Sequence, residues 1–217
     1  MTSLCAQRSL AGAAIRIAIA GADPDGGSLV VMPQALGVTN AVLWVEVDAA
    51  EVARRHAARL DAVTDFGVLR LLCHLPTEMS VPLSGLTDRE RRVVSRLPKG
   101  VASVSDNTIR RLAVPALRLR AAVVCRRDWR TGLRAASRFA PLCPRIAVVD
   151  GPVDPVAAAE ADYYGVGMCI RDEDTSDTVS LVSSSAPKKV AALDPSVWRL
   201  WEEIYLSVDA TTLDAAG

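Results

Sequence analysis

Seven arginines between residues 118 and 138 are the side chains whose type and spacing best suit chemistry with an anion. They are Arg118, Arg120, Arg126, Arg127, Arg130, Arg134 and Arg138. A guanidinium group can bind phosphate through two parallel N–H donors, so this cluster predicts phosphate contacts with a nucleic acid. Such contacts do not depend on base sequence, and we expect them to weaken strongly as salt is added.

The charge of the chain is unevenly distributed along its length. The 217 residues hold 25 Lys and Arg against 25 Asp and Glu, which makes the net charge zero. Residues 86–138 alone hold 14 basic against 4 acidic residues. One interpretation is a surface for a nucleic acid or an acidic partner. The other is that the arginines lie on solvated faces and pair with the acidic remainder of the chain.

Other kinds of reactive site have little support in the residues. The five cysteines form no C-x-x-C pair, which favours free thiols in a reducing, cytoplasmic protein and argues against a disulfide framework or a zinc site. The two histidines, His56 and His74, have no third metal ligand in register. Glycine-rich phosphate loops and nucleophile elbows are absent, and a nucleophile at Cys73 or Cys143 has no evident partner. We therefore expect no metal, cofactor or catalytic residue.

Residues 117–170 carry the clearest structural pattern. Apolar runs at 117–125, 146–149 and 166–170 alternate with segments whose apolar residues recur three and four positions apart. This alternation predicts a βαβαβ core within a mixed α/β fold, with a sheet between helical layers. Asp128 and Asp154 are expected helix caps, and Gly165 is expected to end the second helix.

The flanking segments predict further elements and a division of the chain. We expect strands at 15–20, 29–32, 41–47, 101–104, 108–114 and 178–182, helices at 49–63, 87–97 and 195–208, and either a strand or a short helix at 68–75. Residues 76–85 are rich in Pro, Ser and Thr, which predicts a smaller N-terminal α/β region at 1–80, a second domain at 86–208 and a flexible tail at 209–217. One continuous domain is the alternative.

Residues 86–112 partly resemble a LuxR-type helix-turn-helix domain. The opening Leu86-Thr-Asp-Arg-Glu90, Gly100 and Ile109-Arg-Arg-Leu112 match its pattern. Extra residues separate Gly100 from Ile109, and Pro115 lies where a recognition helix would begin. A helix in the major groove tolerates neither feature well, so we expect strands here instead.

Residues 86–170 resemble the restriction-endonuclease-like PD-(D/E)XK superfamily, in particular its compact bacterial members. The matching residues are Arg127-Asp-Trp129, then Leu133, Ala136, Phe139 and Ala159, and Tyr164-Gly-Val-Gly167. The resemblance implies a nuclease-like fold with a Mg²⁺ site, where an acid and a lysine share one face of the strand before the Arg-Asp-Trp helix. Val123 and Cys125 stand at those positions, so the resemblance implies a degenerate active site.

Three functions follow as hypotheses. The first is a non-catalytic binding or regulatory protein that contacts nucleic acid through the seven arginines. The second is a divergent metal-dependent nuclease that recruits acids from elsewhere, such as Asp106, Glu46 or Asp150. The third is an assembly protein that docks a partner or a second copy through Trp198, Trp201 and Tyr205, although core packing is the simpler role for that aromatic stripe.

Overall fold

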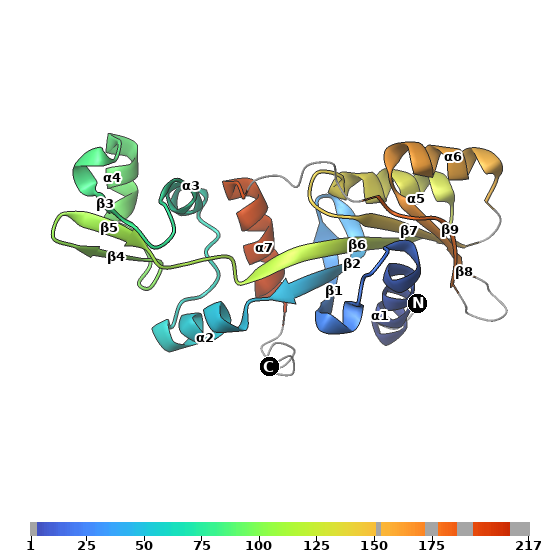
Figure 1. Cartoon of the computed structure of the whole chain (residues 1–217), viewed down its shortest axis with the longest axis horizontal. Helices are drawn as coiled ribbons and strands as arrows, with labels where there is room; N and C mark the ends of the chain where they lie inside the picture. Colours follow the sequence, from blue (N-terminus) through green and yellow to red (C-terminus); the bar gives the residue numbers. More distant parts are fainter. Residues whose placement is uncertain (1–3, 151–152, 172–177, 186–192, 209–217) are drawn as a thin grey trace. The chain divides into compact units, whose positions relative to one another are not determined.

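The computed structural model describes residues 4–150, 153–171, 178–185 and 193–208 (Figure 1). Within them the chain forms seven α-helices, a six-stranded mixed sheet and a three-stranded sheet, which confirms the predicted α/β class. The elements fall into two compact units: Met1–Glu46 with Leu119–Ala191, and Val47–Arg118 with Ala192–Ala215. The predicted tail at 209–217 lies outside the described residues.

The first unit contains the larger sheet. Its elements are α1 (Leu4–Ala18), a 3-10 turn (Pro24–Gly26), β1 (Ser28–Ala35), β2 (Val38–Val47), β6 (Leu117–Arg126), α5 (Trp129–Ala136), a second 3-10 turn (Ser137–Phe139), β7 (Arg145–Asp150), α6 (Pro155–Tyr164), β8 (Gly167–Arg171) and β9 (Thr178–Val182). The strand order is β1-β2-β6-β7-β8-β9. Strands β6, β7 and β8 are parallel, whereas β1 pairs antiparallel with β2 and β9 with β8. The predicted βαβαβ core is therefore confirmed.

Helices cover both faces of this sheet, as Figure 1 shows. Ile146 and Val148 of β7 pack in one apolar cluster with Ile15 of α1. The alternate residues of β7 face α5, where a side chain at Gly132 would lie 3.1 Å from Val149. Because successive strand residues point to opposite faces, α1 and α5 lie on opposite sides of the sheet. The unit has the expected helix–sheet–helix layering.

The predicted strand at 15–20 is wrong, because Leu4–Ala18 is helical. Ala11, Ala14, Ile15 and Ala18 are buried, and their spacing of three, one and three residues is that of one helix face. The apolar run was short enough to suit a strand, but this spacing favours the helix.

Helices α5 and α6 begin at aspartate caps, and α6 ends at a glycine, as predicted. The Asp128 carboxylate accepts a hydrogen bond from the Thr131 N–H at 2.9 Å, and the Asp154 carboxylate accepts one from the Ala157 N–H at 2.7 Å. Gly165 ends α6 in the left-handed conformation, with a φ of 65°. Asp128 is thus a helix cap, the role expected for it.

The second unit packs helices against a small antiparallel sheet of order β3-β5-β4. Its elements are α2 (Ala49–Ala58), α3 (Phe66–His74), β3 (Ser80–Pro82), a 3-10 turn (Leu83–Gly85), α4 (Asp88–Val94), β4 (Ala102–Ser105), β5 (Thr108–Arg111) and α7 (Pro195–Ser207). The segment at 68–75 is therefore helical. The predicted strands at 101–104 and 108–114 correspond to β4 and β5.

Two helices of the second unit are shorter than predicted. Helix α2 ends before Arg59, which adopts a φ of 52°, although Leu60 and Val63 remain buried beyond it. Helix α4 ends at Val94 instead of at residue 97. It has the predicted capping box, in which the Thr87 side chain accepts a hydrogen bond from the Glu90 N–H and the Glu90 side chain accepts one from the Thr87 N–H.

The division between the units does not fall at residues 80–86. Residues 1–80 supply elements to both units, and so do residues 86–208. The two units are interleaved along the chain, and a separate domain at 86–208 stays a prediction.

Candidate nucleic-acid interface

Four of the seven predicted arginines lie on α5 or on the residues directly before and after it. Arg127, Arg130, Arg134 and Arg138, here called the α5 arginine row, are all exposed. Residues three and four apart are neighbours on a helix surface, so Arg130 and Arg134 share one side of α5. Arg127 lies just before the N-cap Asp128, and Arg138 lies in the 3-10 turn after the helix. The opposite side of α5 carries Trp129, Gly132, Leu133 and Ala136, which are buried. Among the described residues none of the four arginines forms an ion pair.

The other three arginines have different surroundings. Arg120 forms an ion pair with Glu46. Arg126 donates to the carbonyl oxygens of Cys125 at 2.7 Å and Thr39 at 2.9 Å. Arg118 is exposed and is grouped with the second unit. The structure therefore gathers four of the seven predicted residues into one surface and leaves the remaining three outside it.

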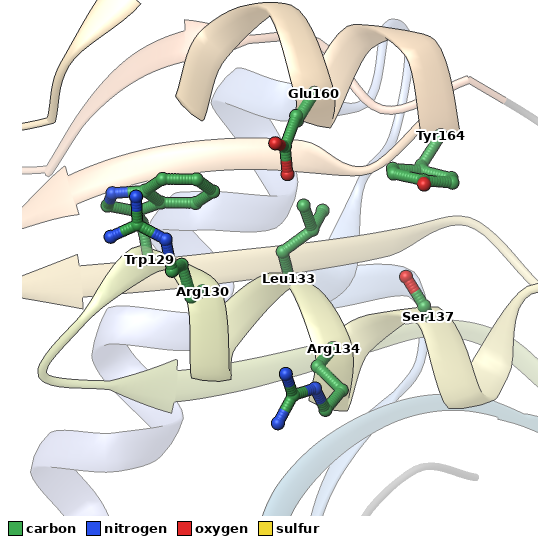
Figure 2. A pocket seen from close by; sticks show the side chains of 7 residues that line it. All are labelled: Trp129, Arg130, Leu133, Arg134, Ser137, Glu160 and Tyr164. Carbon is green, nitrogen blue, oxygen red and sulfur yellow. The ribbon is translucent and has the colours of Figure 1, made fainter. Parts of the chain in front are cut away.

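A groove of about 440 Å³ lies between α5 and α6, beside the arginine row (Figure 2). It is lined by Trp129, Arg130, Leu133, Arg134, Ser137, Glu160 and Tyr164. The Arg130 guanidinium lies over the Trp129 ring, 4.2 Å from its centroid, at one end of the groove. Tyr164 stands at the other end, and its ring meets that of Tyr163 edge to face with the centroids 5.1 Å apart.

The groove combines groups that suit different parts of a nucleotide. Arginines suit phosphate, and exposed aromatic rings can stack on bases. Tyr163 is 84% and Tyr164 52% exposed, whereas Trp129 is buried beneath Arg130. Glu160 projects from α6 toward Leu133, where its carboxylate can accept a hydrogen bond from an amino group. The cations thus lie on the α5 side and an acid on the α6 side.

A second, smaller pocket of about 190 Å³ lies at the carboxyl ends of the parallel strands. This strand-end pocket is lined by Gln7, Asn40, Val42, Cys125, Arg126, Arg127, Asp150 and Arg171. Cys125 and Arg126 end β6, Asp150 ends β7 and Arg171 ends β8. The Arg171 guanidinium pairs with the Asp150 carboxylate at 2.7 Å. Arg127 contributes both to this pocket and to the α5 arginine row.

The positions expected for a nuclease acid and lysine are poor cation ligands. Val123 is fully buried in the cluster that packs against α1. Cys125 is partly exposed, and burial raises the pKa of its thiol to about 11 although Arg171 and Arg126 oppose this. A Mg²⁺ site needs carboxylate oxygens, but among the described residues that line the pocket Asp150 is the one carboxylate, and it is paired with Arg171. The described lining does not fit Mg²⁺.

The acids named for a divergent nuclease are divided between the two compact units. Asp106 lies in the second unit, in the turn between β4 and β5, with a φ of 48°. Glu46 is paired with Arg120 and Asp150 with Arg171 in the first unit. Within the part of the chain that the structure describes, no three His, Cys, Asp or Glu side chains are placed to hold a metal ion.

The three aromatic residues predicted to dock a partner, which lie on α7, differ in how deeply they are buried. Trp198 is fully buried in the core of the second unit, and its indole N–H donates to Glu202 at 2.8 Å. Trp201 and Tyr205 are partly buried. Trp198 therefore has a packing role, and docking through the other two stays a prediction.

Several residues of the two pockets were not singled out from the sequence as site residues. Arg171 and Gln7 belong to the strand-end pocket, and Glu160 and Tyr164 to the groove. The signal that could have found Arg171 is its place at the end of a parallel strand, where ligands of α/β sheets bind. Glu160 and Tyr164 carry no comparable signal.

The described helices include none that is long and apolar enough to cross a membrane. No family model matches the chain, and neither a curated protein nor a solved structure matches it. The likeness to the nuclease-like superfamily therefore rests on the quoted residues alone.

Proposed function

We propose that this protein binds nucleic acid without cutting it, through the α5 arginine row. The observation that carries the proposal is the exposure of four arginines on α5 and the residues that flank it, with no ion pair among the described residues. Unpaired guanidinium groups are free to replace the counterions of a phosphate backbone. The arrangement supports contact with phosphates rather than recognition of a base sequence.

The lack of a suitable cation site among the described residues supports binding rather than cleavage. Val123 is buried, Cys125 offers a thiol, and Asp150 is engaged by Arg171. These three residues would therefore hold no metal ion that could activate a water to cleave a nucleic acid bound along α5. A degenerate member of the nuclease-like superfamily would have these properties, and we retain that membership as part of the proposal.

The test compares two variants with the same change of net charge. Arg130→Gln, Arg134→Gln and Arg138→Gln together remove most of the row. Arg16→Gln, Arg70→Gln and Arg199→Gln remove three exposed arginines from other helices. Binding of labelled DNA and RNA is measured by fluorescence anisotropy between about 50 and 200 mM salt.

We expect wild type and the control variant to bind at low salt and to lose affinity steeply as salt rises. The row variant should bind much more weakly, with a slope of log affinity against log salt that is smaller by about 2 to 3. Absence of any DNA or RNA binding by the wild type at low salt would refute the proposal. Equal losses in both variants would refute the assignment to α5.

A further inference from the structure

The strand-end pocket lies where α/β sheets commonly bind ligands. In parallel α/β sheets the carboxyl ends of the strands form an open edge that loops surround. Here three adjacent parallel strands bring Arg126, Asp150 and Arg171 to that edge, although the residues are distant in sequence. Its volume of about 190 Å³ is below the roughly 300 Å³ at which pockets for drug-sized ligands begin, so it suits a small chemical group.

The charged groups of the pocket favour an anion. The described residues that line it include three guanidinium groups and one carboxylate, and the Arg171–Asp150 pair at 2.7 Å neutralises one of the three. Arg126 is held by two carbonyl oxygens, those of Cys125 and Thr39, so its positive charge is fixed without being neutralised. Arg127 is exposed and contributes a further positive charge. A concave site with fixed positive charge attracts anions more strongly than a flat surface.

The same groups disfavour a divalent cation. Mg²⁺ requires an octahedral set of oxygen ligands, usually including one or two carboxylates, and it would lie among arginines here. Phosphate oxygens accept two parallel N–H bonds from a guanidinium group, which is the strongest geometry available to arginine. The amides of Gln7 and Asn40 also line the pocket and can donate hydrogen bonds.

We propose that the strand-end pocket binds a phosphate group directly through Arg126, Arg127 and Arg171, without a metal ion. The phosphate can come from the end of a nucleic acid or from a small phosphorylated molecule. Arg127 belongs to both the pocket and the α5 arginine row, but Arg130, Arg134 and Arg138 do not line the pocket, and Arg126 and Arg171 do not belong to the row. Variants of these five residues therefore test the two proposals separately. Loss of either activity can be seen without loss of the other.

Cys125 provides a reporter inside the pocket. Cys143 and Cys169 are buried, and Cys73 is partly exposed in the other compact unit. Alkylation by iodoacetamide in mildly alkaline buffer is followed by peptide mass spectrometry, which measures each cysteine separately. The rate at Cys125 is compared with the rate at Cys73 in inorganic phosphate and in chloride of equal ionic strength, with EDTA present throughout.

We expect phosphate to slow alkylation of Cys125 at least several-fold while leaving Cys73 unchanged. Arg126→Gln and, separately, Arg171→Gln should abolish this protection, whereas Arg16→Gln, whose arginine pairs with Asp25, should retain it. The proposal is overturned if phosphate gives no protection, if protection requires Mg²⁺ in place of EDTA, or if both pocket variants remain protected. Circular dichroism of each variant establishes that it is folded.

Two further probes distinguish the sources of the phosphate. If a 5′-phosphorylated oligonucleotide protects Cys125 at lower concentration than its 5′-hydroxyl counterpart and than a nucleoside monophosphate, a nucleic-acid end is the ligand. If the nucleoside monophosphate protects as well as the phosphorylated oligonucleotide, the pocket serves a small molecule. Equal protection by the 5′-hydroxyl and 5′-phosphorylated oligonucleotides, with none by phosphate or the monophosphate, overturns the proposal. Binding of oligonucleotide by the α5 arginine row is measured separately by anisotropy.

Discussion

Single residues determine whether strand β6 of the first unit can supply a ligand for a metal ion. Val123 and Cys125 lie on the face of β6 that packs toward α1, where Val123 is fully buried. A carboxylate at Val123 would be desolvated, since the cluster that buries this position consists of hydrophobic residues. The absence of an acid at this position is therefore consistent with stable packing. It also removes the oxygen that a metal site would need.

At the residue scale, the capping box of α4 makes a testable contribution to stability. Hydrogen bonds from His74 and from the Thr87 hydroxyl and N–H lower the pKa of Glu90 from 4.5 to about 2. A lowered folded-state pKa means that the carboxylate stabilises the folded state above its unfolded-state pKa. That contribution is lost as the pH falls from about 4.5 through about 2.

Urea unfolding of wild type and Glu90→Gln over this pH range measures the effect. We expect the wild type to be more stable near neutral pH and the difference to shrink steadily as the solution is acidified. Ser95→Ala removes a hydroxyl at the other end of α4 and carries no charge change, so its effect should not vary with pH. A Glu90→Gln difference that is constant with pH would contradict this role for the cap.

At the scale of elements, α7 is joined to α2 by a buried ionic network. Glu202 accepts hydrogen bonds from Arg55 at 2.7 and 2.8 Å, from the Val63 N–H at 2.9 Å and from the Trp198 indole at 2.8 Å. Arg55 also donates to Glu51 at 2.8 Å. Arg55 and Glu202 have side chains that are 0% and 1% exposed. Because these charges are removed from water, each depends on its partner.

Removing one partner of this network should be costly. We expect Glu202→Ala to lower the free energy of unfolding by about 3 to 5 kcal/mol, because it leaves Arg55 with one carboxylate and strands two N–H donors. The matched control is Glu203→Ala, whose carboxylate pairs with Arg199 on the exposed side of α7. This surface pair should contribute about 0.5 kcal/mol or less. Similar losses for both variants in urea unfolding would refute the structural role of Glu202.

At the scale of the whole molecule, the basic segment is divided between the two compact units. Residues 86–118 belong to the second unit and residues 119–138 to the first. The local excess of charge in the sequence is therefore shared between two compact units. In the first unit the excess is concentrated in the α5 arginine row and the strand-end pocket, which is why both proposals concern that unit.

The interleaving of the units predicts the behaviour of fragments. A fragment of residues 86–208 lacks α1, β1 and β2 of the first unit and α2 and α3 of the second. It would expose Val123 and Ile146, which α1 packs against, and the core around Trp198 that α3 helps to form. We expect this fragment to show no cooperative urea transition by circular dichroism, in contrast to the full chain. A cooperatively folded fragment would instead establish 86–208 as an independent domain.

Local patterns in the sequence predicted much of the fold. The alternation over 117–170, the caps at Asp128 and Asp154 and the left-handed Gly165 all depend on residues a few positions apart, and all are confirmed. Helix α1 was missed because a short apolar run suits a strand as well as a helix. The alignment that puts Val123 and Cys125 at the positions of a nuclease acid and lysine rests on the resemblance alone and stays a prediction.

Contacts between distant residues were decided by the tertiary structure. Strand order brings Arg126, Asp150 and Arg171 together, and helix packing brings Arg55 to Glu202, 147 positions away. The sequence by itself determined a βαβαβ core and an arginine-rich helix, because these need only local spacing. Which arginines remain unpaired and which surround a pocket depends on the partners that folding supplies, and local spacing carries no information about them.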